Sequence, residues 1–326
     1  MESKFCHAPI MPGRCVEYLR PLPGRVFVDG TLGGGGHAEA VLEKLVPGGR
    51  LIGIDRDDDA LNECRNRLGR FGDAFLAVKG NFKDAPALIG ELGIGRVDGI
   101  MLDLGVSSWQ LDEAGRGFSY SAEGPLDMRM DRSARLTAYD VVNGYEEKRL
   151  AKIIRDYGED HFAVRIASFI ADRRARKPIE TTVELSNIIT EAIPAKFRRQ
   201  GPHPAKRTFQ AIRIEVNGEL EGLEQAVDDM VNLLEEGGRL CVLTFHSLED
   251  RAVKLAMKRM EDPCDCPKNA PYCVCGKKPL GKMLTRKPEV PDDEEQQRNP
   301  RSRSAKLRVF EKAGRSSERN EGIQCQ

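Results

Sequence analysis

The feature that most constrains this chain is a regular alternation of short apolar runs with helix-like stretches over residues 25–105. Such alternation is typical of βαβ units, which build a parallel sheet. Strands are expected at residues 25–28, 51–54, 75–78 and 97–102. Three of these runs lead directly into an aspartate, namely Asp29, Asp55 and Asp103. Because ligands bind beyond the carboxyl ends of strands in open α/β sheets, these side chains should face one crevice.

The middle of the chain has a different pattern. Helical spacing without strands marks residues 150–157, 161–174 and 182–192, and the α/β pattern resumes near residue 208. A chain of 326 residues also exceeds a usual single domain. We therefore expect an α/β domain in two parts, 1–112 and 208–312, an inserted all-helical domain at 113–207, and a disordered tail at 313–326.

A glycine-rich loop follows the first expected strand. A turn of this kind lets the backbone approach a ligand and directs the free N–H groups of the next helix toward it. The loop fits the dinucleotide fingerprint through Gly33, Gly35 and Ala38, and it also resembles a methyltransferase motif that begins at Asp29. By itself it does not choose between these ligands, and a merely flexible turn is the third interpretation.

Three residues near the loop are candidate ligand contacts. Asp55 stands about 20 residues further on, at the next strand's end, where a carboxylate accepts hydrogen bonds from ribose hydroxyls. His37 begins the helix after the loop, and Phe82 is placed to pack on an adenine face. Their alternatives are a solvated acid in an Asp-rich turn, a histidine that only caps the helix or faces solvent, and an ordinary core phenylalanine.

The nine cysteines are unevenly placed. Five stand singly, and four form the CxCx6CxC pattern of Cys264, Cys266, Cys273 and Cys275. Four thiolates suit tetrahedral zinc, so structural zinc is expected, with free or reversibly oxidised thiols as the alternative. The N-terminus lacks a secretory pattern and no apolar run approaches a membrane span, so we expect a cytoplasmic protein without membrane contact.

Local basic patches are the only electrostatic signal for nucleic acid, because Lys+Arg and Asp+Glu balance at 51 each. Residues 196–213 carry basic side chains and no acid, with aromatic rings interleaved, which suits phosphates and stacked bases. A solvated face is the alternative, as it is for the basic residues of 298–308. The candidate RNA contacts are Lys196, Arg198, Arg199, His203, Lys206, Arg207 and Arg213.

Several longer blocks resemble one bacterial family. They are Asp-Leu-Gly-Val-Ser-Ser-Trp-Gln-Leu-Asp at 103–112, Arg-Gly-Phe-Ser at 116–119, and further blocks at 124–131, 203–213, 245–251 and 299–308. In this order they are similar to the ribosomal small subunit methyltransferase H family, also called MraW. The resemblance extends over nearly the whole chain.

The resemblance implies a fold and an activity. The fold would be a Rossmann-like, class I S-adenosylmethionine-dependent methyltransferase domain with the helical insert. The activity would be methyl transfer to N4 of a cytosine in the decoding centre, at the P site of 16S ribosomal RNA. Motif by motif, the cofactor contacts would be Gly35, Gly36, His37, Asp55, Phe82, Asp103 and Gln110. Trp109 stands where the family usually has proline, which puts the shape of that loop in doubt.

Methylation of an exocyclic amine needs positioning and a hydrogen-bond acceptor, because the ring delocalises the nitrogen lone pair. The candidates are Asp103, Ser107 and Ser108, with His246 in second rank. Asp103 could accept from the target amine or from a cofactor amine, or only cap a turn. The RNA or the assembled small subunit would be the partner, and both a monomer and a homodimer stay open.

Two other functions remain compatible with the residues. An NAD(P)-dependent oxidoreductase would use the dinucleotide fingerprint of the glycine loop. An RNA-binding or assembly protein could keep a vestigial cofactor fold, although intact Asp29, Asp55 and Asp103 argue against decay.

Overall fold

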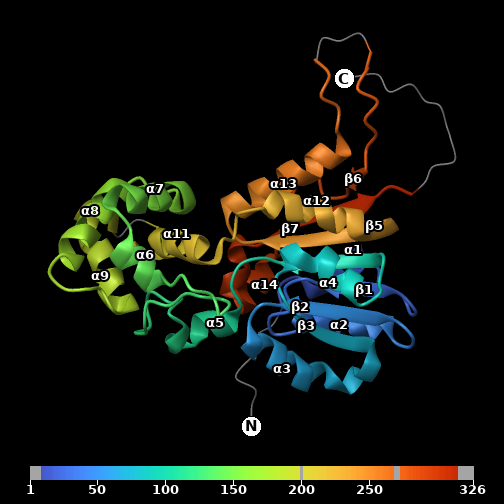
Figure 1. The fold of residues 1–326 in the computed structure, drawn as a ribbon, viewed down its shortest axis with the longest axis horizontal. Coiled ribbons are helices and arrows are strands. Elements are labelled where there is room, and N and C mark those ends of the chain that lie inside the picture. The colour runs from blue at the N-terminus through green and yellow to red at the C-terminus, as the bar shows by residue number, and fades with distance from the viewer. Residues whose placement is uncertain (1–8, 199–200, 268–271, 315–326) are drawn as a thin grey trace. The chain divides into compact units, whose positions relative to one another are not determined.

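The computed structural model describes residues 9–198, 201–267 and 272–314. The chain forms two compact units, a helical unit over Val106–Glu221 and a sheet unit built from the residues on either side of it. In Figure 1 the strand labels belong to the sheet unit, and the labels α5 to α9 and α11 belong to the helical unit. Arg199 and most of the expected tail lie outside the described residues. Within those residues, no helix combines the length and apolarity needed to cross a membrane.

The sheet unit contains one seven-stranded sheet of order β3-β2-β1-β4-β5-β7-β6. Its strands are β1 Val26–Asp29, β2 Arg50–Asp55, β3 Phe75–Lys79, β4 Val97–Asp103, β5 Leu234–Thr244, β6 Gly281–Met283 and β7 Lys306–Lys312. The first five pair in parallel, whereas β7 runs antiparallel to both β5 and β6. The dinucleotide-binding order is 3-2-1-4-5-6, so the inserted antiparallel β7 sets this sheet apart from it.

Helices cover both faces of this sheet, so the strands read as continuous apolar runs. One face shares a core with α1, α2 and α3, which includes Phe27, Met101 and Leu243. The next residue along each strand points to the opposite face, where α12 packs on β5 beside α4 and α13. These helices are α1 Pro12–Leu19, α2 Gly36–Leu45, α3 Asp58–Leu68, α4 Ala85–Glu91, α12 Leu223–Leu233 and α13 Ser247–Glu261, followed by α14 Asp293–Arg298.

The helical unit has a core of its own, formed by aliphatic side chains such as Ile154, Ile166, Ile189 and Ile212. Its helices are α5 Ser108–Asp112, α6 Ala138–Gly144, α7 Glu147–Gly158, α8 Ala163–Arg174, α9 Thr182–Ala192, α10 Ala195–Arg198 and α11 Lys206–Asn217. The unit is wider than the expected 113–207, because α11 packs against α7 instead of returning to the sheet. The sequence did not predict α11, because the basic residues of its first turn, Lys206 and Arg207, were interpreted only as part of a basic patch.

Residues 113–136 of this unit have little regular structure and are held by specific polar contacts. The guanidinium of buried Arg116 donates to the carbonyl oxygens of Arg129 and Met130 at 3.0 and 3.1 Å. Asn217 accepts the N–H of Met130 and donates to the carbonyl of Met128, both at 2.8 Å. The blocks at 116–119 and 124–131 therefore fix a loop on the helical core.

Candidate active site

The carboxyl ends of β1, β2 and β4 meet at one edge of the sheet, as expected from their closing aspartates. Asp29 pairs with Gly53 of β2 and with Met101 of β4. The chain then turns sharply, because Thr31 N–H donates to Asp29 Oδ1 at 3.1 Å and Asp103 N–H donates to Thr31 Oγ1 at 2.5 Å. The turn after β1 thus holds the ends of β1 and β4 together.

The glycine loop packs closely on its surroundings. Gly35 has φ +74°, and a Cβ there would lie 2.8 Å from the sulfur of Cys64 on α3. Its N–H donates to Leu32 O at 2.8 Å and its carbonyl accepts from Glu39 N–H. Gly35 therefore serves the close packing of the loop. Helix geometry leaves the N–H groups of the first turn of α2, including those of Gly36 and His37, without intrahelical partners.

Asp55 is a structured carboxylate and not a solvated acid. Oδ2 accepts from Gly33 N–H at 2.8 Å and Oδ1 from Asp57 N–H at 2.9 Å, while burial raises the pKa of Asp55. Asp57 is also accounted for, since it caps α3 through Asp59 N–H at 3.1 Å. Each oxygen of Asp55 keeps a second lone pair, so the group can still accept two hydroxyls.

Phe82 lies at the same edge, in a single 3-10 turn at Phe82–Asp84. A Cβ on Gly30 would lie 3.1 Å from Phe82 Cβ and 2.5 Å from Leu102 Cδ2. The absence of a side chain at residue 30 therefore lets the half-buried phenylalanine lie against the turn after β1.

Asp103 faces His37 across this edge. His37 Nδ1 lies 3.5 Å from Asp103 Oδ2, and His37 Nε2 lies 2.8 Å from the carbonyl oxygen of Ile10. A carbonyl only accepts, so Nε2 donates to Ile10, and Nδ1 of a neutral ring presents its lone pair to Asp103. A protonated Asp103, or an imidazolium, is then needed for attraction. His37 is buried and orients Asp103, whereas the sequence also allowed a ligand-facing or solvent-facing ring.

The titration of this pair is shifted by its surroundings. Burial raises the pKa of Asp103 to about 7, and the negative charge of Glu249 adds to the effect. Burial lowers the pKa of His37. The Asp103 side chain is 28% exposed, yet its Oδ1 is buried and has no hydrogen-bond partner within the described residues. Buried acceptors normally have a donor, so this unpaired oxygen is an exception that calls for an explanation.

His246 lies just beyond the carboxyl end of β5, where it caps α13. Its Nδ1 accepts from Glu249 N–H at 3.4 Å, and Glu249 Oε2 accepts from the N–H groups of Phe245 and His246 at 2.9 and 3.3 Å. Sequence reasoning missed Glu249, which is buried and influences Asp103. The available signal was a capping box, with a glutamate three residues after the cap.

Ser107, Ser108 and Gln110 belong to the helical unit. Ser107 caps α5 by accepting from Gln110 N–H at 3.2 Å, and Gln110 Oε1 accepts from Ser107 N–H at 3.1 Å. Ser108 is the first residue of α5. The structure thus shows a capping box at this loop, while the catalytic and cofactor contacts suggested for the three residues remain predictions.

The basic stretch divides into exposed and buried members. Lys196, Arg198, His203, Lys206 and Arg207 are exposed. The ring of His203 stacks on Tyr120 with centroids 4.6 Å apart. Arg198 and Arg207 each donate to a backbone carbonyl while staying exposed, and Lys196 lies over Phe197. An exposed basic and aromatic surface therefore exists on the helical unit.

Arg213 does not belong to that surface. Its Nε and Nη2 donate to the two carboxylate oxygens of Glu219, both at 2.8 Å, and the two side chains are 16% and 6% exposed. This bidentate pair explains an arginine on the inner side of α11. Its expected role as an RNA contact conflicts with this burial.

The second basic stretch is also partly internal. Residues 306–310 lie in β7, and the Nε of Arg308 donates to Asp250 Oδ1 at 2.6 Å. Only 3% of Arg308 is exposed. Part of this stretch therefore joins β7 to α13 and is not a solvated tail.

The four clustered cysteines lie together, with their sulfur atoms all within 4.8 Å of one another. They stand on the loop between α13 and β6, and Asp103 stands at the end of β4.

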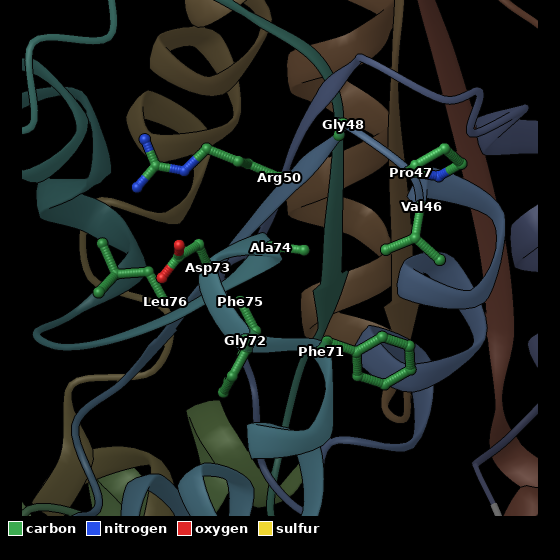
Figure 2. Close-up of a pocket in the computed structure, with 11 residues that line it drawn as sticks. Val46, Pro47, Gly48, Arg50, Phe71, Gly72, Asp73, Ala74, Phe75 and Leu76 are labelled. Atoms are coloured by element: carbon green, nitrogen blue, oxygen red, sulfur yellow. The ribbon is translucent and has the colours of Figure 1, made fainter.

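Figure 2 shows a pocket elsewhere on the sheet unit, lined by residues 46–50 and 71–76. Arg50 begins β2 and Phe75 begins β3, so this pocket lies at the amino ends of these strands. It is at the edge opposite to Asp55 and offers Arg50 and Asp73 as its charged groups. Its position does not suit a ligand of the aspartate edge.

Comparison with known proteins gives the family. The model of the MraW methylase family matches residues 4–313. The chain belongs to this family. Because the MraW proteins are methylases, this membership identifies the glycine loop as a methyltransferase motif and not as a dinucleotide fingerprint. The sheet unit is accordingly a Rossmann-like methyltransferase domain, and the oxidoreductase alternative is wrong.

Curated relatives in the MraW family match along nearly their full length. Ribosomal RNA small subunit methyltransferase H of Lachnospira eligens is 52% identical over 309 residues, which are 95% of this chain and 98% of that protein. The protein of the same name from Clostridium botulinum (strain Kyoto / Type A2) is 53% identical over 309 residues, 95% of this chain and 99% of its own. The one from Carboxydothermus hydrogenoformans is 52% identical, with coverage of 95% and 98%.

Proposed function

We propose that this chain transfers a methyl group from S-adenosylmethionine to N4 of a cytosine in the decoding centre, at the P site of 16S ribosomal RNA. Membership in the MraW family and the names of its relatives support a ribosomal RNA substrate. The observation that carries the proposal is the buried, unpartnered Oδ1 of Asp103 among the described residues. Such an oxygen suits an amine donor at the carboxyl edge of the sheet.

The residues at this edge fit S-adenosylmethionine. Asp55 would accept the ribose hydroxyls, Phe82 would pack on the adenine, and the first-turn N–H groups of α2 would hold the carboxylate. Gly36 and His37 provide those N–H groups, whereas Gly35 shapes the loop. When bound, the cofactor supplies a methyl group already activated on a cationic sulfur.

Asp103 is the residue that would act on an amine proton. When ionised, its carboxylate accepts an N–H, either from the cofactor's amino group or from the cytosine. When protonated, the carboxyl can donate through Oδ2 to Nδ1 of His37. Burial, together with the negative charge of Glu249, raises the pKa of Asp103, so its ionised form is a more basic acceptor than an ordinary aspartate. Measuring cofactor affinity and methyl transfer separately identifies which amine it holds.

The exposed surface of the helical unit would hold the RNA. Lys196, Lys206 and Arg207 suit phosphates, and the stacked rings of His203 and Tyr120 suit an unpaired base. A base must leave its stack to reach a cofactor site, so a platform for flanking nucleotides is useful. The partner would be the small ribosomal subunit or its RNA.

Radiolabelled methyl transfer onto small subunits that lack the modification tests the proposal. Labelled 16S RNA is expected, with N4-methylated cytidine as the labelled nucleoside identified by mass. Label on another base would overturn the cytosine assignment. Binding of S-adenosylhomocysteine without transfer to any small-subunit RNA would favour an RNA-binding or assembly protein instead.

A further inference from the structure

The segments 262–267 and 272–280 connect the end of α13 at Glu261 to the start of β6 at Gly281 and extend from the sheet unit (Figure 1). Their base is closed by hydrogen bonds from Leu280 N–H to Met260 O and from Met283 N–H to Glu261 Oε1, both at 2.9 Å. Further out, Tyr272 and Val274 are 71% and 76% exposed. These two large side chains thus face solvent and do not contribute to a core.

Four cysteines meet in that outer part. The sulfur of Cys273 lies 3.6 Å from that of Cys264, 3.8 Å from that of Cys266 and 3.4 Å from that of Cys275. The sulfur atoms of Cys264 and Cys275 are 3.9 Å apart. Two short segments on either side of the loop therefore bring all their thiols to one point.

These distances fit one metal ion and not disulfides. A disulfide needs about 2.05 Å between sulfur atoms, well below each separation here. Zinc binds four thiolates tetrahedrally at about 2.3 Å, and the edge of that tetrahedron is about 3.8 Å. The observed separations of 3.4 to 3.9 Å lie around this value. We propose that Cys264, Cys266, Cys273 and Cys275 bind one Zn²⁺ ion.

The surroundings of the sulfur atoms support thiolate ligands. Val274 N–H points at Cys266 Sγ at 3.3 Å, as backbone donors do around metal-bound thiolates. Lys277 and Lys278 follow Cys275 after one glycine and would offset the negative charge of a four-thiolate zinc site. Lys277 also pairs with Asp265 at 2.6 Å, between the two cysteine segments.

The ion would stabilise the loop between α13 and β6 in place of a hydrophobic core. Ordering a solvent-exposed loop costs conformational entropy, and metal binding supplies free energy that buried apolar surface supplies elsewhere. The cysteines follow the last turn of α13, whereas His246 caps its first turn. A helix of 15 residues spans about 22 Å, so the metal stands far from that cap and takes no part in methyl transfer.

Metal analysis of the purified full-length protein tests the inference. After dialysis against metal-free buffer, about one zinc per chain is expected. Titration with a mercurial thiol reagent in the presence of a colorimetric zinc indicator should release that zinc as the cluster thiols react. Replacement of zinc by Co²⁺ should give the visible absorption of tetrahedral cobalt bound to thiolates.

Variants assign the metal to these residues. Cys273→Ser together with Cys275→Ser should reduce bound zinc to a small fraction of one per chain and speed tryptic cleavage near Lys277. The matched control is Val274→Ser, which changes an exposed neighbour in the same segment and should keep zinc and protease resistance.

Zinc-free protein whose cluster thiols all react freely, or a mass showing disulfides among them, overturns the inference. So does full zinc retention in the double cysteine variant. These outcomes concern metal content and cleavage alone, so they leave the proposed methyl transfer untouched. The mercurial titration of the unmodified protein decides the matter even if the double variant fails to fold.

Discussion

The aspartate edge of the sheet and the basic surface of the helical unit hold their charges in opposite ways. At the edge, Asp103 lies beside the buried ring of His37, and burial raises the pKa of Asp103. On the helical unit, Lys206 and Arg207 are exposed and share their task with neighbours. A buried charged group without a partner can perform a role that no neighbour replaces, whereas several exposed charges can share one role. Single substitutions should therefore have large effects in the first region and small ones in the second.

The largest effect is expected from Asp103→Asn. The amide keeps the size of the side chain but removes the negative acceptor, so methyl transfer to small subunits should fall about a thousandfold. Single-turnover assays give the rate, and calorimetry with S-adenosylhomocysteine gives the affinity. An unchanged affinity would assign Asp103 to the cytosine amine, and a matching loss would assign it to the cofactor amine.

Asp98→Asn is the matched control for this substitution. Asp98 lies near the opposite end of β4, where it accepts from Val26 N–H and pairs with Arg25. The same chemical change in the same strand should leave transfer within a few-fold of the unsubstituted protein. Near-normal transfer by Asp103→Asn would remove Asp103 from the chemistry and end the contrast between the two regions.

The second effect concerns cofactor affinity. Asp55→Asn replaces one carboxylate oxygen by an amide nitrogen that cannot accept, so one ribose hydroxyl loses its acceptor, which should cost about 2 kcal/mol, or about 30-fold in S-adenosylhomocysteine affinity. Asp58→Asn is the control from the same acidic run, because Asp58 is exposed and paired with Lys79. Equal affinity losses in both variants would show that Asp55 acts only through the general field of this run.

Much of this edge could be predicted from the sequence, for a physical reason. Strand ends and the loop after β1 are local features, because apolar runs and glycines encode them directly. The positions of Asp29, Asp55 and Asp103 at one edge follow from parallel pairing, which the βαβ pattern implies. The structure agrees with all three positions.

The features of the site that the sequence did not predict are contacts between residues that lie far apart along the chain or are paired only in the folded structure. The ring of His37 is turned toward Ile10, and Glu249 reaches Asp103 through its field from the first turn of α13. Arg213 reads as one more basic residue until Glu219 is seen beside it on the folded helix. Burial and pairing of charges are decided by packing, so composition alone overestimated the basic surface.

The pH dependence should show a third effect. With the pKa of Asp103 raised to about 7 by burial, its acceptor form grows as pH rises. Transfer should therefore increase about tenfold from pH 6 to pH 8, because each pH unit below the pKa reduces the ionised fraction about tenfold. Single-turnover rates at saturating cofactor test this. The residual activity of Asp103→Asn should be flat over the same range, and an equal rise there would assign the titration to another group.

The smallest effect is expected on the helical unit. Replacing Lys206 and Arg207 together by alanine removes two exposed charges, so KM for small subunits should rise only about three- to tenfold, with a weaker dependence on salt. Affinity for S-adenosylhomocysteine should not change. Steady-state kinetics at two salt concentrations measure the effect.

Arg213→Ala is the contrasting variant within the same stretch of sequence. It would leave the carboxylate of Glu219 buried without its bidentate partner, which should lower the free energy of unfolding by about 3 kcal/mol. Urea unfolding compares it with the Lys206 and Arg207 variant, whose stability should be nearly unchanged. Were Arg213→Ala to keep full stability and instead raise KM, Arg213 would belong with the exposed RNA surface. The contrast between buried and exposed basic residues would then not hold for Arg213, the residue on which it most depends.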